Sequence, residues 1–314
     1  MAAVSIIVPL FNKERFILRA LASIARQTWT DFEVLIVDDG STDRGPERAA
    51  GFADPRFRML RQSNAGPGAA RNRGIEETSG ELLAFLDADD EWLPGYLENG
   101  VGALHKNPAA AAATSAYYEC PGERSSVALW ERRGLVTGLH RITASTSPAL
   151  LVSMLAFLSP CTTVSRRSVV QRWGGFYGRD RCLYAEDAFL WLKILLNEPV
   201  WFDLAPLTRI FRDASELGNL RSARPLEPFL QHPEEIQQHC PPELLPLLDA
   251  FFATRAFKTA AVWSYWGKWR EGQALRYRFR MADDYRLPYF WRSLACSNPL
   301  GAAMCAVSRA VRWK

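Results

Sequence analysis

Apolar and amphipathic segments alternate along the first hundred residues. Val4–Leu10 is a continuous apolar run, which is typical of a strand buried on both faces of a parallel sheet. In the next segment, Lys13–Gln27, apolar residues recur at helical spacing, so a helix should pack back on that strand. The alternation continues with strands expected at Glu33–Val37, Phe57–Leu60 and Glu81–Leu86 and a helix at Pro67–Thr78. This order predicts an α/β fold with a doubly wound, mainly parallel sheet.

The pattern is less regular beyond Pro94. Helices are expected from residue 95 to about Asn107, at Arg167–Trp173 and at Glu186–Leu196, and extended segments at Ala109–Tyr118, Thr162–Ser165 and Val200–Arg212. Pro121–Ser147 is polar and contains glycine, so it is predicted to be a loop. From Pro228 onward the apolar spacing is helical. We therefore expect an α/β domain at 1–220, with halves 1–110 and 111–220, and a mainly α-helical C-terminal region at 221–314.

Aspartates follow two of the predicted strands at the point where each ends. Asp38-Asp39 follows one strand, and Asp87-Ala88-Asp89-Asp90 follows another. In open α/β sheets, ligands bind beyond the carboxyl ends of the strands. These side chains should therefore converge on one site.

The Asp87-Ala88-Asp89 segment favours a divalent cation. Like charges this close raise one another's pKa unless a cation neutralises them, and carboxylate oxygens suit Mg²⁺ or Mn²⁺. A solvated acidic loop is the alternative for an isolated Asp-x-Asp segment. Its context, with the second acidic pair at Asp38-Asp39, favours the metal site.

The segment Asn64–Gly74 places glycines and basic side chains between a predicted strand and a helix. Its basic side chains, including Arg71, could face a diphosphate. Gly66-x-Gly68, with Asp87 about twenty positions later, also mimics a dinucleotide fingerprint, so a dinucleotide-dependent oxidoreductase is an alternative. The match is imperfect, because Arg71 replaces the third glycine and the segment does not follow the first strand.

Four segments in order resemble the family 2 glycosyltransferases of the GT-A type. They are Val4–Glu14, Val34–Asp43, Asn64–Gly74 with Gly80-Glu81, and Phe85–Asp90. The resemblance is strong over residues 1–110, is weaker to about residue 220 and fades beyond it. It implies a Rossmann-like nucleotide-binding half followed by an acceptor half. The implied reaction moves a sugar from a nucleotide-sugar, most often a UDP-sugar, to a hydroxyl of a glycan or lipid-linked acceptor. The corresponding process is cell-surface polysaccharide synthesis.

On the donor side, the resemblance gives each matching residue a role. The nucleoside pocket would be lined by three residues near the first strand: Pro9, Phe11 and Glu14. Asp39 would bond the base, and Arg71 would help to hold the nucleotide. Asp87 and Asp89 would contact the ribose and the metal-bridged diphosphate, with Mn²⁺ or Mg²⁺ as the metal.

On the acceptor side, Glu186-Asp187 resembles the Glu-Asp motif of the family. Asp187 would be the general base, which implies inversion at the anomeric carbon. Glu186 and Trp191 would contact the acceptor or the donor sugar, and Arg212 the diphosphate. Taken alone, Glu186-Asp187 could be a first-turn acidic pair favoured by the helix dipole.

The net charge of +4 is unevenly distributed. Residues 255–314 carry twelve Lys and Arg against three Asp and Glu, a charge of +9, so residues 1–254 carry −5. Trp263, Trp266 and Trp269 lie at i, i+3 and i+6 in this basic region, a pattern of helix packing that also suits an anionic membrane surface. We expect peripheral membrane contact without a spanning helix. A nucleic-acid-binding module is the non-enzymatic alternative, but acidic strand ends would repel a phosphate backbone, so no nucleic acid is expected.

Cysteine and histidine spacing adds no metal site. The six cysteines form no Cys-x-x-Cys pair, and the four histidines lack ligand spacing. Reduced, mostly buried thiols are typical of a cytosolic protein. The first residues include no basic segment typical of a signal peptide, so we expect a cytoplasmic enzyme, with possible attachment to the inner face of the membrane.

Overall fold

The computed structural model describes residues 3–214 and 222–312. The chain divides into two compact units. Met1–Ile142 and Met154–Gly218 form the first unit, which contains the sheet. Thr143–Ser153 and Asn219–Lys314 form the second, which is mainly helical. Helix α6 (Pro148–Phe157) contains one of the points at which the chain passes from one unit to the other, between Ser153 and Met154.

The strands of the first unit form one mixed sheet in the order β3-β2-β1-β4-β9-β6-β10-β5. In sequence, the strands of this path are β1 (Val4–Leu10), β2 (Phe32–Asp38), β3 (Phe57–Arg61), β4 (Leu82–Phe85), β5 (Glu91–Trp92), β6 (Ala112–Cys120), β9 (Thr163–Arg166) and β10 (Val200–Phe211). The first four in spatial order are mutually parallel, β9 is antiparallel to both of its neighbours, and β6 and β10 are parallel. The predicted α/β fold with a mainly parallel sheet is confirmed.

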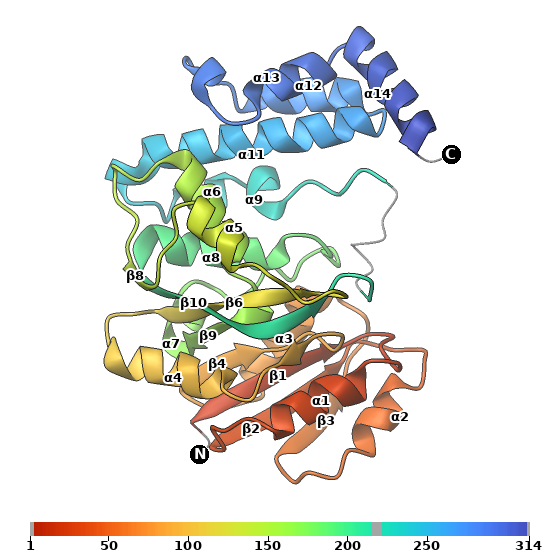
Figure 1. Ribbon diagram of the computed structural model, residues 1–314, viewed down its shortest axis with the longest axis vertical. Helices are drawn as coiled ribbons and strands as arrows, with labels where there is room; N and C mark the ends of the chain where they lie inside the picture. The colour runs from red at the N-terminus through yellow and green to blue at the C-terminus, as the bar shows by residue number, and fades with distance from the viewer. Residues whose placement is uncertain (1–2, 215–221, 313–314) are drawn as a thin grey trace. The chain divides into compact units, whose positions relative to one another are not determined.

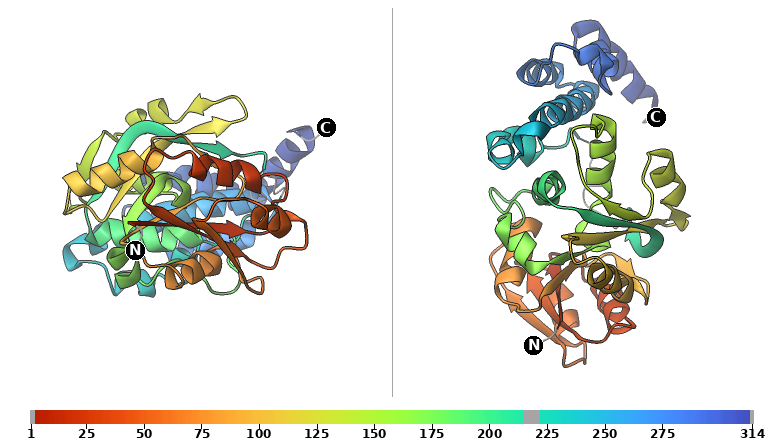
Figure 2. Two further views of the ribbon diagram at one scale, coloured as in Figure 1. Left: turned by 90° about the horizontal axis from the view of Figure 1, so that it is seen from below. Right: turned by 90° about the vertical axis from the view of Figure 1, so that its left-hand side faces the viewer.

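Helices cover both faces of this sheet (Figure 1, Figure 2). Helices α1 (Ile17–Ala25) and α4 (Tyr96–Lys106) contribute to the same apolar core as the side chains of Val4, Ile6 and Val8. Helix α3 (Pro67–Glu76) packs on the opposite side chain of β1, Ile7. A Cβ at Gly74 would lie 2.4 Å from Ile7 Cγ2, so only glycine permits this approach.

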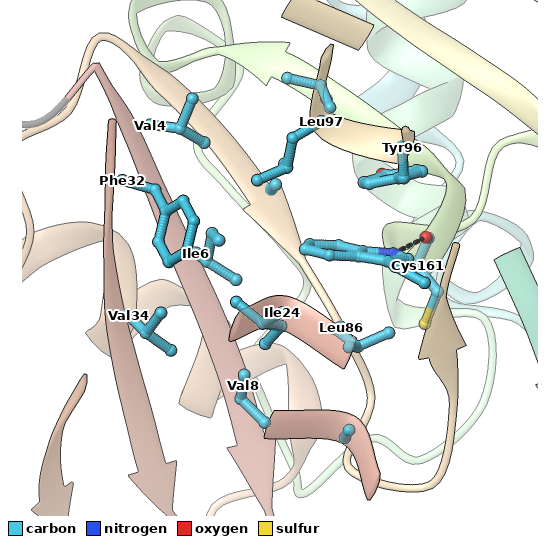
Figure 3. Close-up of a cluster of buried hydrophobic side chains, with 14 of the residues drawn as sticks. Val4, Ile6, Val8, Ile24, Phe32, Val34, Leu86, Tyr96, Leu97 and Cys161 are labelled. Carbon is cyan, nitrogen blue, oxygen red and sulfur yellow. Dashed lines mark hydrogen bonds between the residues drawn. The ribbon is translucent and has the colours of Figure 1, made fainter. Parts of the chain in front are cut away.

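The core between β1, β4 and α4 supports the turn that follows β4. Trp92 stacks on Tyr96 with ring centroids 4.2 Å apart, and its indole N–H donates to the Cys161 carbonyl oxygen at 2.7 Å (Figure 3). Trp92 is 1% exposed and packs in the same cluster as Leu86. Both ends of the Asp87–Asp90 segment are therefore anchored in rigid core.

The segment predicted as a loop, Pro121–Ser147, contains regular structure. Its elements are β7 (Arg124–Ser125), α5 (Val127–Arg132) and β8 (Gly138–His140), with β7 paired to β6 and β8 to β10. Within the short α5, only Trp130 is buried, so the segment lacks the repeated apolar spacing that predicts a helix. The remaining helices of the first unit are α2 (Gly45–Ala50), α7 (Arg167–Arg172) and α8 (Glu186–Asn197).

The second unit is built around α11 (Leu245–Tyr265), as predicted from its helical spacing. Helices α12 (Trp269–Arg278), α13 (Phe290–Cys296) and α14 (Pro299–Arg312) contact α11, and the short helices α9 (Pro228–Gln231) and α10 (Glu234–Gln237) precede it. Within the described residues, the molecule has no helix of sufficient length and hydropathy to cross a membrane.

The three tryptophans of the basic region do not form one helical stripe. Trp263 lies on α11, Trp266 follows the last residue of that helix, and Trp269 begins α12. Gly267 separates the helices with a φ of +93°, a conformation that glycine adopts readily. The spacing of i, i+3 and i+6 therefore crosses a turn. The prediction that the three tryptophans lie on one side of a single helix was wrong.

Candidate active site

Three aspartates gather where the chain leaves β4. In the turn after this strand, the Asp90 backbone N–H donates to the Asp87 carbonyl oxygen at 3.0 Å. The Asp87 side chain is 37% exposed, whereas Asp89 and Asp90 are buried. Asp90 also accepts a hydrogen bond at 2.9 Å from the backbone N–H of Phe211, the last residue of β10. The turn is therefore fixed against β10 with one carboxylate open and two enclosed.

The cluster carries more negative charge than its surroundings neutralise. Burial, followed by the charges of Asp89 and Asp87, raises the pKa of Asp90 to about 8. Burial and Asp87 also raise the pKa of Asp89, although Lys13 opposes this shift. A cation would stabilise the ionised carboxylates and lower both pKa values.

Lys13 contributes an ammonium group that pairs with Asp89. Its Nζ lies 2.8 Å from Asp89 Oδ2 and donates at 2.9 Å to the backbone carbonyl oxygen of Ala214. The Arg19 guanidinium donates to the main-chain carbonyl oxygen of Asp89. Asp89 is thus held by groups from the segment after β1 and from α1.

Arg71 links the acidic cluster to the start of α8. This α3 residue is 3% exposed, and its guanidinium reaches Asp87 Oδ1 at 2.7 Å and Glu186 Oε1 at 2.8 Å. Burial by itself would lower the pKa of Arg71, but the charges of Asp87 and Glu186 outweigh it and raise the pKa. One buried cation therefore bridges the predicted donor side and the predicted acceptor side.

Close backbone packing brings these two sides together. A Cβ at Gly68, in the first turn of α3, would lie 2.3 Å from the carbonyl oxygen of Tyr177. The Tyr177 backbone N–H donates at 3.1 Å to the carbonyl oxygen of Glu186. Asn72 adds a hydrogen bond from its side-chain amide to the Phe176 carbonyl oxygen at 2.8 Å. The absence of a side chain at Gly68 is therefore required for this approach.

Asp187 lies in the first turn of α8, beside Glu186. Its side chain is half-buried, and burial followed by the charge of Glu186 raises its pKa to about 7, although Arg71 opposes the shift. A carboxyl group with this pKa is divided between its acid and base forms near neutral pH, which is the range that suits a general base. The role of Asp187 as the general base stays a prediction, and a pKa of about 7 is compatible with it.

Asp39 holds the loop before α3. Its carboxylate accepts hydrogen bonds of 2.8 Å from the Gln62 side chain and from the backbone N–H groups of Ala65 and Gly66. Asp39 Oδ2 accepts only the Gly66 bond among the hydrogen bonds of the described residues. Because a carboxylate oxygen has two lone pairs, one acceptor position remains for a ligand.

The other predicted nucleoside contacts lie around the carboxyl end of β1. Pro9 and Phe11 are both half-buried there. Glu14 accepts a hydrogen bond at 3.0 Å from the Arg44 backbone N–H, and its own N–H donates to Asp43 at 2.8 Å. The structure thus ties the β1 and β2 ends to each other.

Two predicted contacts occupy very different environments. Arg212 is 57% exposed and lies 3.2 Å from Glu119 Oε1. Trp191 is 0% exposed and packs edge-to-face on Phe176, with ring centroids 5.8 Å apart. Trp191 therefore packs in the core in this structure and presents no surface to a sugar.

A pocket of about 140 Å³ lies beside the acidic cluster. Its lining includes Arg212 and the end of β10, and the complete set is Asp87, Asp89, Asp90, Ser159, Ile210, Phe211 and Arg212. A larger pocket of about 380 Å³ lies in the helical unit and contains none of the predicted site residues. The smaller pocket is the relevant one, because it contains the perturbed carboxyl groups.

The sequence interpretation did not assign a role to Lys13 or to Asp90. The candidate metal group formed by Asp87, Asp90 and Cys161 has ligand atoms within 4.8 Å of one another, whereas Asp89 is paired with Lys13. Burial raises the pKa of the Cys161 thiol, so it remains protonated and is a poor ligand for a hard cation. The sequence did contain one signal for the role of Lys13: a basic residue shortly after the end of the first predicted strand.

The chain belongs to glycosyl transferase family 2. The model of this family, described as "Glycosyl transferase family 2", matches residues 5–174, which is more than half of the chain. The matched region contains β1, Asp39, Arg71 and the Asp87–Asp90 turn. The predicted family membership is therefore confirmed, and the alternative of a dinucleotide-dependent oxidoreductase is not retained.

Two curated relatives each match about a third of the chain. The uncharacterized glycosyltransferase YibD of Escherichia coli K12 is 46% identical over 96 residues, 30% of this chain and 28% of the relative. The UDP-Glc:alpha-D-GlcNAc-diphosphoundecaprenol beta-1,3-glucosyltransferase WfgD of Escherichia coli is 37% identical over 105 residues, 33% of this chain and 42% of the relative. Each match thus spans less than half of the relative.

Two solved structures share the fold over most of the chain. Staphylococcus aureus TarS 1-349 in complex with UDP-GlcNAc has a TM-score of 0.56 and 17% identity, with 93% of this chain and 90% of that chain covered. The mannosyltransferase PcManGT of Pyrobaculum calidifontis, in complex with GDP-Man and Mn²⁺, has a TM-score of 0.54 and 19% identity, with 100% and 81% covered. These similarities confirm the GT-A fold with a helical C-terminal region.

Proposed function

We propose that this chain transfers a sugar from a UDP-sugar to a hydroxyl of a glycan or lipid-linked saccharide, with inversion at the anomeric carbon. The observation that carries the proposal is the Arg71 bridge, which places Asp87 of the family's Asp-x-Asp segment beside the Glu186-Asp187 pair. TarS binds UDP-GlcNAc and WfgD is a UDP-glucose-dependent enzyme, which supports a UDP-sugar donor. WfgD also supports a lipid-linked acceptor and a role in polysaccharide synthesis.

The carboxylates after β4 fit a divalent cation. They offer hard oxygen ligands at a small pocket, and burial together with the charges of Asp89 and Asp87 raises the pKa of Asp90 to about 8. Asp87 and Asp89 would hold Mn²⁺ or Mg²⁺, with Asp90 close by. When bound, the ion would neutralise the charge that develops on the departing diphosphate. The Mn²⁺ complex of PcManGT agrees with this proposal.

The chain's own residues would position the donor and move the proton. The free acceptor position on Asp39 Oδ2 suits the N–H of the base, next to Pro9 and Phe11. Arg212, exposed at the pocket, would contact the diphosphate. Arg71 keeps Asp87 and Glu186 in place.

Asp187 would remove the proton from the acceptor hydroxyl. The hydroxyl oxygen then forms a bond to the anomeric carbon while the bond from that carbon to the diphosphate breaks, and its electron pair leaves on the phosphate oxygen. Attack from the face opposite the diphosphate inverts the configuration. Glu186 would assist by holding Arg71 and the start of α8, close to the acceptor.

The reaction would take place in the cytoplasm, at the inner face of the membrane when the acceptor is lipid-linked. Cys120, Cys161, Cys182 and Cys240 form no disulfide bond in the described structure, which is typical of a reducing compartment. The basic helical unit would provide the membrane contact. A polysaccharide acceptor would reach the same Asp187 without this contact.

A donor screen tests the proposal. The full chain is incubated with UDP-, GDP- and dTDP-sugars, with Mn²⁺ or with a chelator, and both thermal stabilisation and release of the nucleoside diphosphate are measured. We expect a UDP-sugar to stabilise the protein and to be hydrolysed only when Mn²⁺ is present. If stabilisation and hydrolysis are the same with the chelator as with Mn²⁺, the proposed metal dependence is wrong. If only GDP- or dTDP-sugars give a response, the proposed UDP-sugar donor is wrong.

A further inference from the structure

Helix α14 exposes an apolar stripe. Leu300, Met304 and Val307 are 80%, 75% and 65% exposed. Their spacing of i, i+4 and i+7 places them on one side of the helix. An exposed side chain of this kind is ordinary on its own, but three in one stripe indicate a surface with a partner.

Helix α13 carries a second exposed apolar stripe, formed by two residues. Trp291 is 64% exposed and Leu294 is 40% exposed, at i and i+3. Tryptophan is the side chain most typical of the interface between lipid and water, because its ring is apolar and its N–H is polar. Both stripes lie within the last 30 residues of the chain.

The inner sides of both helices are fixed by close packing. Ser297, between α13 and α14, is 1% exposed and its hydroxyl lies 2.9 Å from the hydroxyl of Ser264 on α11. A Cβ at Gly301 would lie 1.9 Å from the carbonyl oxygen of Ala295. The two helices can therefore turn very little on α11, so the exposed stripes keep their outward orientation.

The charge of this segment has a single sign. Residues 285–314 contain five Lys and Arg and no Asp or Glu. Arg292 is exposed on α13, and Arg286 lies just before that helix. Basic side chains near an anionic lipid surface are attracted to its negative charge. A protein partner would have to present a wholly acidic surface around an apolar groove, whereas an anionic bilayer offers both features over any area.

We propose that α13 and α14 dock this protein on an anionic lipid bilayer. The stripe of Leu300, Met304 and Val307, with Trp291, enters the boundary between headgroups and acyl chains, and the arginines contact lipid phosphates. Only the use of this contact, to bring the site to a lipid-linked acceptor, rests on the proposed function. The binding itself can be measured without any donor or acceptor.

Vesicle flotation of the full chain tests the surface. The vesicles contain phosphatidylcholine alone or a mixture with phosphatidylglycerol, and three proteins are compared: the parent, L300Q/M304Q/V307Q, and the control V136Q/L139Q. Val136 and Leu139 are 60% and 44% exposed in the first unit, so the control replaces exposed apolar side chains away from α13 and α14. We expect the parent and the control to float with anionic vesicles only, and the triple variant to bind at least about tenfold more weakly.

Two further experiments test the contribution of the arginines and the alternative that the stripe binds a second copy of the chain. R286Q/R292Q should also bind more weakly, and about 0.5 M salt should reduce binding by the parent. Equal flotation of the parent and the triple variant overturns the proposal. It is also overturned if size-exclusion chromatography shows that the parent is a dimer, the triple variant is a monomer and neither floats, because the stripe then binds a second copy.

The test remains valid if the transferase proposal fails. All variants are first compared by circular dichroism and thermal unfolding, and since the changed side chains are exposed, unchanged profiles are expected. Nucleotide-dependent thermal stabilisation should also be unchanged in the triple variant. Loss of flotation with retained stabilisation supports the membrane surface, and flotation without any nucleotide response contradicts only the proposed reaction.

Discussion

The two acidic groups of the site differ in the cations that face them. In the first group, Lys13 pairs with Asp89 and Arg71 with Asp87, whereas in the second group Arg71 pairs with Glu186 and opposes the rise in the pKa of Asp187. The first group retains a partly exposed carboxylate at a pocket, and the second has a carboxyl with a pKa near 7. Because the residue types are nearly the same, the difference in chemistry comes from burial and counter-charge: one group suits a metal ion and the other a proton.

Replacing the proposed base should have the largest effect on this comparison. Asp187→Asn removes the proton acceptor while it keeps the size and polarity of the side chain. We expect turnover with the identified donor and acceptor to fall by about 10²- to 10⁴-fold. Binding of UDP by isothermal titration calorimetry should remain within a few-fold, since the nucleotide contacts lie on the other acidic group.

A matched substitution shows whether the base is specific. Asp180→Asn changes an aspartate in the same loop region, before α8, that has no role in the proposed mechanism. Its turnover should match that of the parent. If Asp187→Asn also stays within a few-fold of the parent, the proton acceptor is another group and the contrast between the two acidic groups is lost.

Removing the cation shared by both groups should destabilise the fold. Arg71→Met leaves Asp87 and Glu186 without their buried partner, and breaking such a pair costs about 3–5 kcal/mol. The free energy of unfolding is measured by urea denaturation. Arg73→Met is the control on the same helix, because Arg73 is 51% exposed and its pair with Glu77 lies at the surface, so little change is expected.

A small change for Arg71→Met would contradict the bridge. In that case the two acidic groups are held by other contacts, and Arg71 has a binding role only. If the protein is destabilised as expected, the addition of Mn²⁺ should recover part of the loss, because a cation at Asp87 replaces one of the two missing charge interactions.

The pH dependence should distinguish the proton group from the metal group. The pKa of Asp187 is raised to about 7 by burial, so its base form decreases as the pH falls below 7. Well below this pKa, kcat/KM should decrease about tenfold per pH unit, and it should level off above it. The profile is measured at saturating Mn²⁺, and Mn²⁺ binding is followed over the same range to separate the two groups. A flat profile between pH 5 and about 7 contradicts Asp187 as the base.

The sequence was most informative about the buried strands and about the polar residues that follow them. Val4–Leu10 was predicted with its observed bounds, because an apolar run between polar residues marks a buried strand. Asp87 and Asp89 could be assigned to one edge of the sheet for the same reason. The short elements between Pro121 and Ser147 could not be predicted, because α5 buries only Trp130.

Long-range ion pairs were the main part of the site that sequence could not give. Arg71 and Glu186 are 115 positions apart, and Lys13 and Asp89 are 76 positions apart. Charge alone cannot select these partners among 38 basic and 34 acidic residues. Trp191 had a predicted role at the sugar, but its helical position does not tell which side of α8 faces the core, and the structure buries it.

The smallest expected effect concerns Lys13. Its ammonium group contacts the same Asp89 carboxylate that would bind the metal ion. Its Nζ lies 2.8 Å from Asp89 Oδ2, so a cation that binds this oxygen must compete with an ammonium group. Lys13→Met keeps the length of the side chain and removes the charge. We expect Mn²⁺ to bind about fivefold more tightly without nucleotide, because a repulsive charge at this distance is removed from a buried site. UDP should bind more weakly, since its diphosphate loses a nearby positive charge.

Calorimetry with Mn²⁺ alone and then with UDP measures both changes, and Lys13→Arg, which keeps the charge, should change neither by much. Weaker Mn²⁺ binding by Lys13→Met would mean that Lys13 positions Asp89 for the ion, and the first acidic group would then need its ammonium as much as the second needs Arg71.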